Sequence, residues 1–236
     1  QQLEETQAQR FPDVPVLRFD RDRVSRKGVM DRQLEDVRRG DSCLMVGTQM
    51  LAKGHHFPAV TLVVIVNIDQ AMYSADYRAL ERMGQMILQV AGRAGRSDKP
   101  GSVILQTLHP EHAALDVLLN RGYEDYASQL LDEREMAGLP PAGYQALLRA
   151  EAHHKGMVED FLRAAQRVFP EGGTRVFGPM PAIMERMDGR SRMYLVLLSD
   201  NRAALHGQID RWLPLVRQMR LSRKIRWSVD VDPQEL

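Results

Sequence analysis

The segment QVAGRAGR, residues 89–96, places a glutamine, two arginines and two glycines at helical spacing. On a helix, spacings of four and three residues put Gln89, Arg93 and Arg96 on one face. Two guanidinium groups on one face repel each other unless an anion lies there, and a guanidinium binds phosphate oxygens in a bidentate way. In phosphoryl transfer, such an arginine stabilises the charge that develops on the γ-phosphate. One interpretation is therefore that Arg93 and Arg96 reach a polyphosphate.

The same residues also fit the C-terminal end of a helix. Basic residues favour the last helical turn, and glycine commonly ends a helix. This interpretation explains Gly95 and one arginine, but it leaves Gln89 and the second arginine unexplained. On the pattern alone, both interpretations stay open.

A second polar segment, residues 46–63, has the sequence VGTQMLAKGHHFPAVTLV. It predicts a strand, a polar turn and a second strand. Gly47 and Thr48 leave the first strand where backbone N–H groups and a hydroxyl can bind a phosphate. The loop that follows contains Lys53, Gly54, His55 and His56. Two adjacent histidines are compatible with a metal, but no cysteine or paired carboxylate lies nearby to complete a site, so we expect no metal in this chain.

The composition is that of a soluble globular protein. The 236 residues are 44% hydrophobic and 27% charged, and no apolar run approaches the ~20 residues of a membrane span. No charged-then-apolar leader opens the chain, and a start at Gln indicates a processed or excised chain. Cys43 is the single cysteine, which excludes a disulfide or a zinc cluster and favours a reducing, cytoplasmic setting.

The net charge of +1 says little about nucleic acid, but its distribution is uneven. Residues 1–135 carry 17 Lys and Arg against 20 Asp and Glu, whereas residues 136–236 carry 15 against 11. Near the C-terminus, RLSRKIRW interleaves basic and aromatic residues, which is typical of a phosphate-contacting surface. The alternative is a solvated edge strand protected by Lys and Arg. Trp212 and Trp227 are predicted to pack in the core.

The first part of the chain alternates short apolar runs with helical patterns. We predict strands in VPVLRF, SCLMVGT, VTLVVIVNID and GSVILQTL, the third of them buried on both faces. A helix is predicted in GVMDRQLEDVRRG, and two more between His109 and Ala137. A long helix is predicted in ADYRALERMGQMILQVAGRAG, with core candidates Leu80, Met83, Ile87, Leu88 and Val90. This alternation predicts a parallel α/β sheet.

The segment AGLPPAGYQ, residues 137–145, is the predicted domain boundary, because Pro140 and Pro141 stop the preceding helix. It divides the chain into domains 1–137 and 138–236. The second part predicts a strand, a helix, two or three strands with a Gly/Pro turn, a long helix and a last strand. This order fits a small two-layer α+β sandwich like the ferredoxin fold. Asn201 is the expected cap of the long helix, and Pro214 inside it predicts a kink or a break.

Several segments resemble those of one enzyme family. GTQMLAKGHHFP followed by QVAGRAGR is similar to motifs V and VI of superfamily 2 helicases. RFDRD, SADYRALER, LQTLHPEH and the ending WSVDVDP, in this order, resemble the primosomal replication-restart helicases. The resemblance covers essentially the whole chain. It implies a RecA-like second helicase lobe, a P-loop NTPase fold, followed by a C-terminal DNA-binding domain.

The resemblance implies the function of an ATP-dependent 3′-to-5′ DNA helicase. Such enzymes recognise stalled or collapsed replication forks and help to reload the replicative helicase, in the bacterial cytoplasm at the nucleoid. ATP and Mg²⁺ are bound mainly by a first lobe with a phosphate-binding loop and a DExH-type acid. This chain has no G-x-x-x-x-G-K-[ST] segment, so we expect no ATPase activity from it alone. The family's zinc-binding insertion would lie before Gln1, and we expect no zinc here.

By position, the resemblance also implies roles for individual residues. Arg93 and Arg96 would be the motif VI arginines that face ATP, with Gln89 as their polar companion. The DNA backbone would be contacted by Gly47, Thr48, Gln49 and Lys53. The coupling of that contact to the nucleotide cleft would fall to Gly54, His55 and His56. Many related helicases have an acid near the position of His56, which is a departure from the pattern.

For the C-terminal domain, the resemblance implies branched DNA and the acidic C-terminal tail of single-stranded DNA-binding protein as partners, together with other primosome proteins. Arg202 matches a tail-contacting arginine, and His206 lies one turn further along the helix. An arginine at a helix start is otherwise a poor place for a cation. Arg223, Lys224 and Arg226 are the candidates for DNA phosphate contacts.

Two rival functions are compatible with parts of the sequence. Another superfamily 2 translocase, such as a fork-reversal or RNA-processing enzyme, would share motifs V and VI, but the ending WSVDVDP argues against it. A non-catalytic DNA-binding adaptor would contain a lone RecA-like lobe. The intact mass of the native protein distinguishes the adaptor from a helicase with two lobes.

Overall fold

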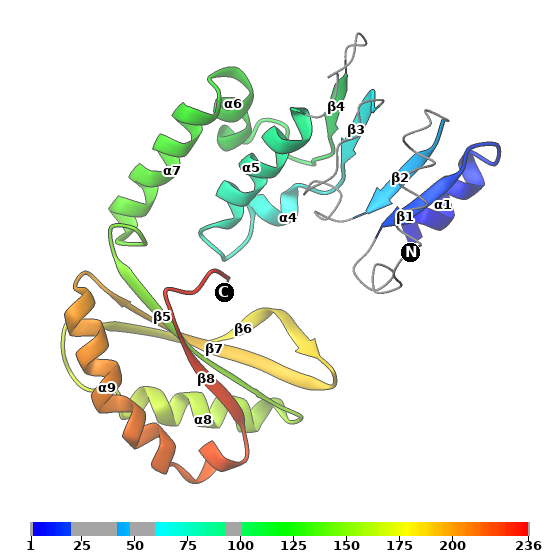
Figure 1. Ribbon diagram of the computed structural model, residues 1–236. Coiled ribbons are helices and arrows are strands. Elements are labelled where there is room, and N and C mark those ends of the chain that lie inside the picture. Colours follow the sequence, from blue (N-terminus) through cyan, green and yellow to red (C-terminus); the bar gives the residue numbers. More distant parts are fainter. Residues whose placement is uncertain (1, 20–41, 48–59, 93–100, 236) are drawn as a thin grey trace. The chain divides into compact units, whose positions relative to one another are not determined.

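The computed structural model describes residues 2–19, 42–47, 60–92 and 101–235 (Figure 1). These residues form two compact units. The first consists of Gln1–Tyr73 and Ala79–Leu118, and the second of Ser74–Arg78 and Leu119–Leu236. The second unit thus begins before the predicted boundary at residue 137. The domain limits of 1–137 and 138–236 stay a prediction.

The first unit contains two pairs of parallel strands. β1 (Val16–Phe19) pairs with β2 (Leu44–Gly47), and β3 (Leu62–Ile65) pairs with β4 (Ser102–Leu105). All four strands lie in segments that the sequence predicts as strands. Its helices are α1 (Gln2–Arg10), α4 (Asp69–Met72), α5 (Ala79–Ala91) and α6 (Ala113–Asn120), the last two residues of which belong to the second unit. The sequence pattern did not predict α1, and the helix predicted in GVMDRQLEDVRRG lies outside the described residues.

The prediction that VTLVVIVNID is buried on both faces is wrong. Leu62 is 53% exposed and Val64 is 51% exposed, whereas Val63 and Ile65 are partly buried. Among the described residues β3 pairs with β4 alone, and α5 contacts both strands. Alternate side chains of a strand point to opposite faces, so one set packs and the other reaches solvent.

Helix α5 buries one face, as its spacing predicts. Met83 and Ile87, one turn apart, are 2% and 4% exposed. Leu80 and Val90 are partly buried. Leu88, predicted to be in the core, is 42% exposed because it lies outside this buried stripe.

The second unit contains an antiparallel sheet with the strand order β6-β7-β5-β8. Its strands are β5 (Tyr144–Ala152), β6 (Arg175–Met187), β7 (Arg190–Ser199) and β8 (Arg226–Val231). Its helices are α7 (Tyr123–Ala137), α8 (Lys155–Arg167), α9 (Arg202–Gln218) and the short 3-10 helix η2 (Arg220–Arg223). β5 pairs with both β7 and β8, which leaves β8 as an edge strand.

Helices α8 and α9 cover the same face of this sheet (Figure 1). On α8, Val158, Phe161, Leu162 and Ala165 follow the i, i+3, i+4, i+7 pattern, and all four are fully buried. Trp212 of α9 is fully buried against them, and its indole N–H donates to the Ala165 carbonyl at 2.8 Å. The prediction that Trp212 is a core residue is confirmed.

Local sequence signals set the ends of several elements. The Asn201 side chain accepts a hydrogen bond from the Ala204 N–H at 2.9 Å, so Asn201 caps α9 as predicted. The helix then continues through Pro214 without a break.

The β6–β7 turn is formed by Asp188 and Gly189, both with positive φ, as a two-residue type I′ hairpin turn requires. Gly178-Pro179, the predicted turn, lies inside β6 at a register shift.

No helix in the described ranges is long and apolar enough to cross a membrane.

Candidate nucleic-acid interface

Residues 89–92 of the QVAGRAGR segment lie at the end of α5. Gln89 is exposed in the last turn of this helix, and the Gly92 N–H donates to the Leu88 carbonyl at 2.9 Å. Arg93 and Arg96 lie outside the described residues. Their position beside Gln89 on one helix face stays a prediction.

The second polar segment begins at the carboxyl end of β2. Gly47, the last residue of this strand, is exposed. The remaining predicted DNA and coupling residues of this segment lie outside the described residues; they are Thr48, Gln49, Lys53, Gly54, His55 and His56. In the described part of the chain, no group of three or more His, Cys, Asp or Glu residues is placed to hold a metal.

The three basic residues predicted to contact DNA lie together between α9 and β8. Arg223 ends η2, Lys224 follows it and Arg226 begins β8, and all three are exposed. Ile225, between them, is 6% exposed and anchors the segment in the core. Alternation around one buried residue therefore holds these cationic side chains at the surface.

Trp227 fixes this segment rather than offering a free ring. Its indole N–H donates to the Ser222 carbonyl at 3.2 Å, and its ring centroid lies 6.0 Å from that of Phe161. The side chain packs against the core on the helix-covered face. The predicted packing role of Trp227 is confirmed.

Strand pairing brings further basic residues to the same end of the sheet. Glu151 pairs with both Arg226 and Arg192, Ala152 pairs with Ser191, and Arg186 pairs with Ser191. The ends of β5 and β6 therefore lie beside the starts of β7 and β8. We define the basic end as residues 151–155, 185–192 and 220–226. It contains eight Lys and Arg residues against three Asp and Glu, a concentration that the net charge of +1 conceals.

Only part of this charge is neutralised within the unit. Glu151 Oε1 lies 3.2 Å from Arg226 Nη1, and Glu151 Oε2 lies 3.8 Å from Arg192 Nε. Lys155 Nζ lies 2.5 Å from Glu185 Oε1, and this hydrogen bond and charge raise the pKa of Lys155. The lysine is therefore cationic at neutral pH. The excess of positive charge suits a polyanion such as a nucleic-acid backbone.

The predicted partner-binding residues lie at the other end of α9. Arg202 and His206 are exposed in its first turns, whereas the C-terminal end of this helix leads into η2. The 17 residues of α9 correspond to about 25 Å at the helical rise. Arg202 Nη2 lies 3.5 Å from Asp232 Oδ2, and its side chain is 64% exposed. The two sets of predicted residues are thus separate surfaces.

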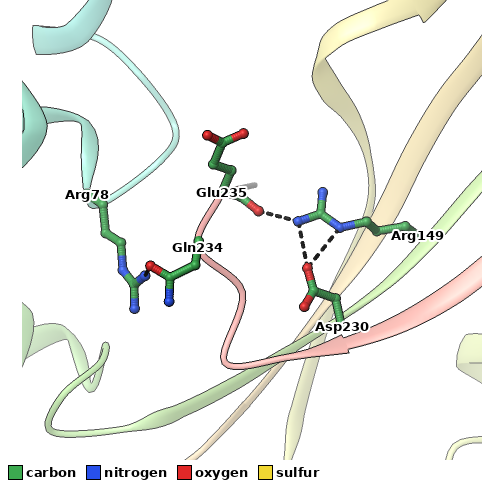
Figure 2. Close-up of polar contacts among 5 residues, drawn as sticks. All are labelled: Arg78, Arg149, Asp230, Gln234 and Glu235. Carbon is green, nitrogen blue, oxygen red and sulfur yellow. Dashed lines mark hydrogen bonds and ion pairs between the residues drawn. The ribbon is translucent and has the colours of Figure 1, made fainter. Parts of the chain in front are cut away.

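The segment after β8 is held by two arginines (Figure 2). Arg149 donates to Asp230 Oδ2 from Nε at 3.3 Å and from Nη2 at 3.1 Å, and it also donates to the Glu235 carbonyl. Arg78 Nη1 donates to Gln234 Oε1 at 3.0 Å. These contacts fix the C-terminal segment beyond Asp232 to the sheet and to the Ser74–Arg78 segment of the same unit.

Two family models match this chain. Residues 3–98 match the helicase conserved C-terminal domain, and residues 135–234 match the primosomal protein N C-terminal domain. Over the whole length of this chain, the sequence is 44% identical to the replication restart protein PriA of Haemophilus influenzae. The chain belongs to the PriA family.

Other members of the PriA family are similar over nearly the whole chain. The replication restart protein PriA of Synechocystis is 36% identical over 99% of the chain, and that of Bacillus subtilis is 29% identical over 99%. The match covers 32% of the Haemophilus protein, 28% of the Synechocystis protein and 29% of the Bacillus protein. The chain thus spans about a third of the length of these relatives and corresponds to their C-terminal part.

The PriA C-terminal match, residues 135–234, contains both surfaces described above. It includes predicted residues Arg202, His206, Arg223, Lys224 and Arg226. Sequence reasoning missed the rest of the basic end, which comprises His153, His154, Lys155, Arg186, Arg190 and Arg192. The available signal was that HHK and RMDGRSR each border a strand end, but only the pairing register shows that these ends coincide.

Proposed function

We propose that this chain is the second helicase lobe and C-terminal domain of an ATP-dependent 3′-to-5′ DNA helicase. The enzyme acts at stalled or collapsed replication forks and promotes restart by primosome assembly. The observation that carries this proposal is the match to replication restart PriA proteins over the whole chain, with the helicase C-terminal domain at residues 3–98.

The fold details of the proposal are supported by the strand order. The first unit would be part of a RecA-like lobe, and its parallel strand pairs are compatible with a parallel sheet. Counted within the second unit, the strand order is 2-3-1-4, with a helix after the first and third strands. This is the order expected of a ferredoxin-like α+β sandwich.

ATP and Mg²⁺ would be bound mainly by a first lobe, with Arg93, Arg96 and Gln89 facing the nucleotide from this chain. The segment from Gly47 to His56 would link the DNA contact to that cleft. A helicase needs this link because the cleft closes on ATP and opens after hydrolysis, and the grip on DNA moves in each cycle. The whole family member would also hold zinc outside this chain.

The second unit would bind forked DNA and the acidic tail of single-stranded DNA-binding protein. The basic end supports the first role, because eight cationic side chains face three carboxylates there. Arg202 supports the second role, because its guanidinium is largely exposed and already contacts one carboxylate, that of Asp232. Other primosome proteins would assemble on the same complex.

The experiment that tests the function is strand displacement by the protein at its native length. Forked DNA duplexes with a 3′ or a 5′ single-stranded arm are mixed with ATP, and with a non-hydrolysable analogue as control. ATP-dependent unwinding along the 3′ arm is the expected result. Binding to DNA without ATP hydrolysis would instead indicate an adaptor. Equal unwinding of RNA duplexes would indicate another translocase.

A further inference from the structure

A hollow of about 530 Å³ opens at the basic end, where α8 begins beside the β6–β7 hairpin. It is lined by residues 153–156 together with Glu185, Arg186 and Ser191. Strand pairing places Ser191 between Ala152 on one side and Arg186 on the other. The lining thus comes from the start of α8 and from the two strands of the β6–β7 hairpin, about 30 residues further along the chain.

The hydroxyl of Ser191 is an unused donor in this hollow. Ser191 is 8% exposed, and none of the described residues forms a hydrogen bond with its side chain. Ser191 Oγ is not one of the described buried atoms that lack a partner, so it is still reached by solvent and is open to the hollow. A ligand oxygen in the hollow would accept a hydrogen bond from this hydroxyl.

The first turn of α8 offers two further donors. His154 stands at the N-cap position but its side chain caps no N–H group, and the Met157 N–H donates to the His154 carbonyl at 3.2 Å. Within the described part of the chain, no acceptor takes the N–H groups of Lys155 and Gly156. A Cβ at Gly156 would meet no atom within 4 Å, so the space beside this turn is open. Free N–H groups at a helix N-terminus bind anions.

The charges around the hollow also favour an anion. Arg186 is exposed and has no ion-pair partner among the residues that the structure describes. Glu185 is the one carboxylate in the lining, and Lys155 holds it at 2.5 Å. Two cations therefore face one carboxylate, with His153 and His154 beside them.

We infer that this hollow binds a phosphate group of the DNA backbone. A phosphate oxygen would accept from the Ser191 hydroxyl and from the first turn of α8, while the Arg186 guanidinium pairs with the phosphate charge. DNA is the occupant that the surroundings favour, because the same end carries Arg190, Arg192, Arg223, Lys224 and Arg226, enough to follow a chain of phosphates. This inference rests on the proposed DNA-binding role of the second unit.

The test is forked-DNA binding by the protein at its native length, titrated at several salt concentrations. Arg186→Gln should weaken binding about tenfold and reduce the salt slope by about one, because one phosphate contact is lost. Ser191→Ala should weaken binding about threefold with the salt slope unchanged, because the hydroxyl is neutral. The matched control is Arg167→Gln, which removes an exposed positive charge from the last turn of α8, outside the basic end. Thermal unfolding confirms that each variant is folded.

Phosphate binding in the hollow is contradicted if Arg186→Gln binds DNA no more weakly than Arg167→Gln, or if Ser191→Ala binds DNA as tightly as the wild type does. In that case the double variant Arg223→Gln, Lys224→Gln tests separately whether the second unit binds DNA at all. If it weakens DNA binding, the second unit still binds DNA and only the hollow is wrong. If it binds normally, the DNA-binding role of the second unit fails as well. The inference would also be overturned if Arg186→Gln and Ser191→Ala weakened the binding of an acidic peptide but left the binding of forked DNA unchanged.

Discussion

Glu151 is shared by two arginines from the strands on either side of it. Arg226 Nη1 of β8 lies 3.2 Å from one carboxylate oxygen, and Arg192 Nε of β7 lies 3.8 Å from the other. The Glu151 side chain is 21% exposed, and that of Arg226 is 78% exposed. One half-buried carboxylate therefore orients two guanidinium groups at the basic end and neutralises only one of them.

Replacing this carboxylate should strengthen DNA binding. In Glu151→Gln the basic end gains one positive charge, so forked-DNA affinity should rise and its salt slope should steepen by up to about one. The free energy of unfolding should fall by about 1 kcal/mol at most, because Arg226 is 78% exposed and Arg192 Nε, at 3.8 Å, is too far away for a hydrogen bond. Glu171→Gln, an exposed acid outside the basic end, is the control. Equal effects of the two variants on DNA affinity would contradict the role of Glu151.

Asp232 should compete with an acidic partner for Arg202. The two side chains lie 3.5 Å apart at the surface, a pair of the kind that contributes about 0.2–1 kcal/mol. Asp232→Asn should therefore raise the affinity for an acidic-tail peptide by up to about fivefold, and Arg202→Ala should lower it. Fluorescence anisotropy with a labelled peptide measures both. Asp210→Asn, an exposed acid further along α9, should leave the affinity unchanged. An affinity that does not rise in Asp232→Asn would exclude this competition.

Trp212 should be a main contributor to the stability of the second unit. Its ring is fully buried and packs edge-to-face against Phe169, with the ring centroids 4.9 Å apart. Its indole N–H donates to the Ala165 carbonyl. Trp212→Ala should lower the free energy of unfolding by about 3–5 kcal/mol. Trp212→Phe should lower it by about 1–3 kcal/mol, because the carbonyl loses its donor. Urea unfolding measures both, and a loss below about 1 kcal/mol for the alanine variant would contradict this packing role.

Alkaline pH should destabilise the second unit through Tyr194. Burial of this side chain raises its pKa, with a smaller contribution from Asp76. The unfolded chain then releases the proton first, at the ordinary pKa of about 10, so stability is fully present below that pH and falls as pH rises above it.

Urea unfolding of the wild type and of Tyr194→Phe, at pH 8 and at pH 10.5, checks this dependence. The variant should lose less stability between the two pH values. Some loss should remain, because burial also raises the pKa of Tyr77. Identical losses in both proteins would show that Tyr194 does not titrate as described.

Local signals predicted most elements of the second unit. The spacing of Val158, Phe161 and Leu162 identifies α8, and Asn201 marks the start of α9. These signals act within a few residues, so the sequence carries them directly. The exposure of Leu62 and Val64 could not be predicted in the same way, because it depends on what covers the sheet rather than on the strand itself.

The candidate site was predictable only in part, because some of its residues are brought together by strand pairing between distant segments. Arg223, Lys224 and Arg226 are close in the sequence and form a visible basic run. Ser191 and Arg186 contribute because β5, β6 and β7 pair in one register, and a shift of one residue would turn their side chains to the other face. Long-range pairing of this kind leaves no local mark.

The central claim, that this chain supplies part of a helicase ATPase site, is tested most directly by Arg96→Ala in the protein at its native length. DNA-stimulated ATP hydrolysis is measured together with ATP binding and forked-DNA binding. Turnover should fall by about a thousandfold or more while both affinities are kept, as expected for an arginine at the transferring phosphate. Turnover near that of the wild type would contradict it, and residues 89–96 would then be a glycine-capped helix end.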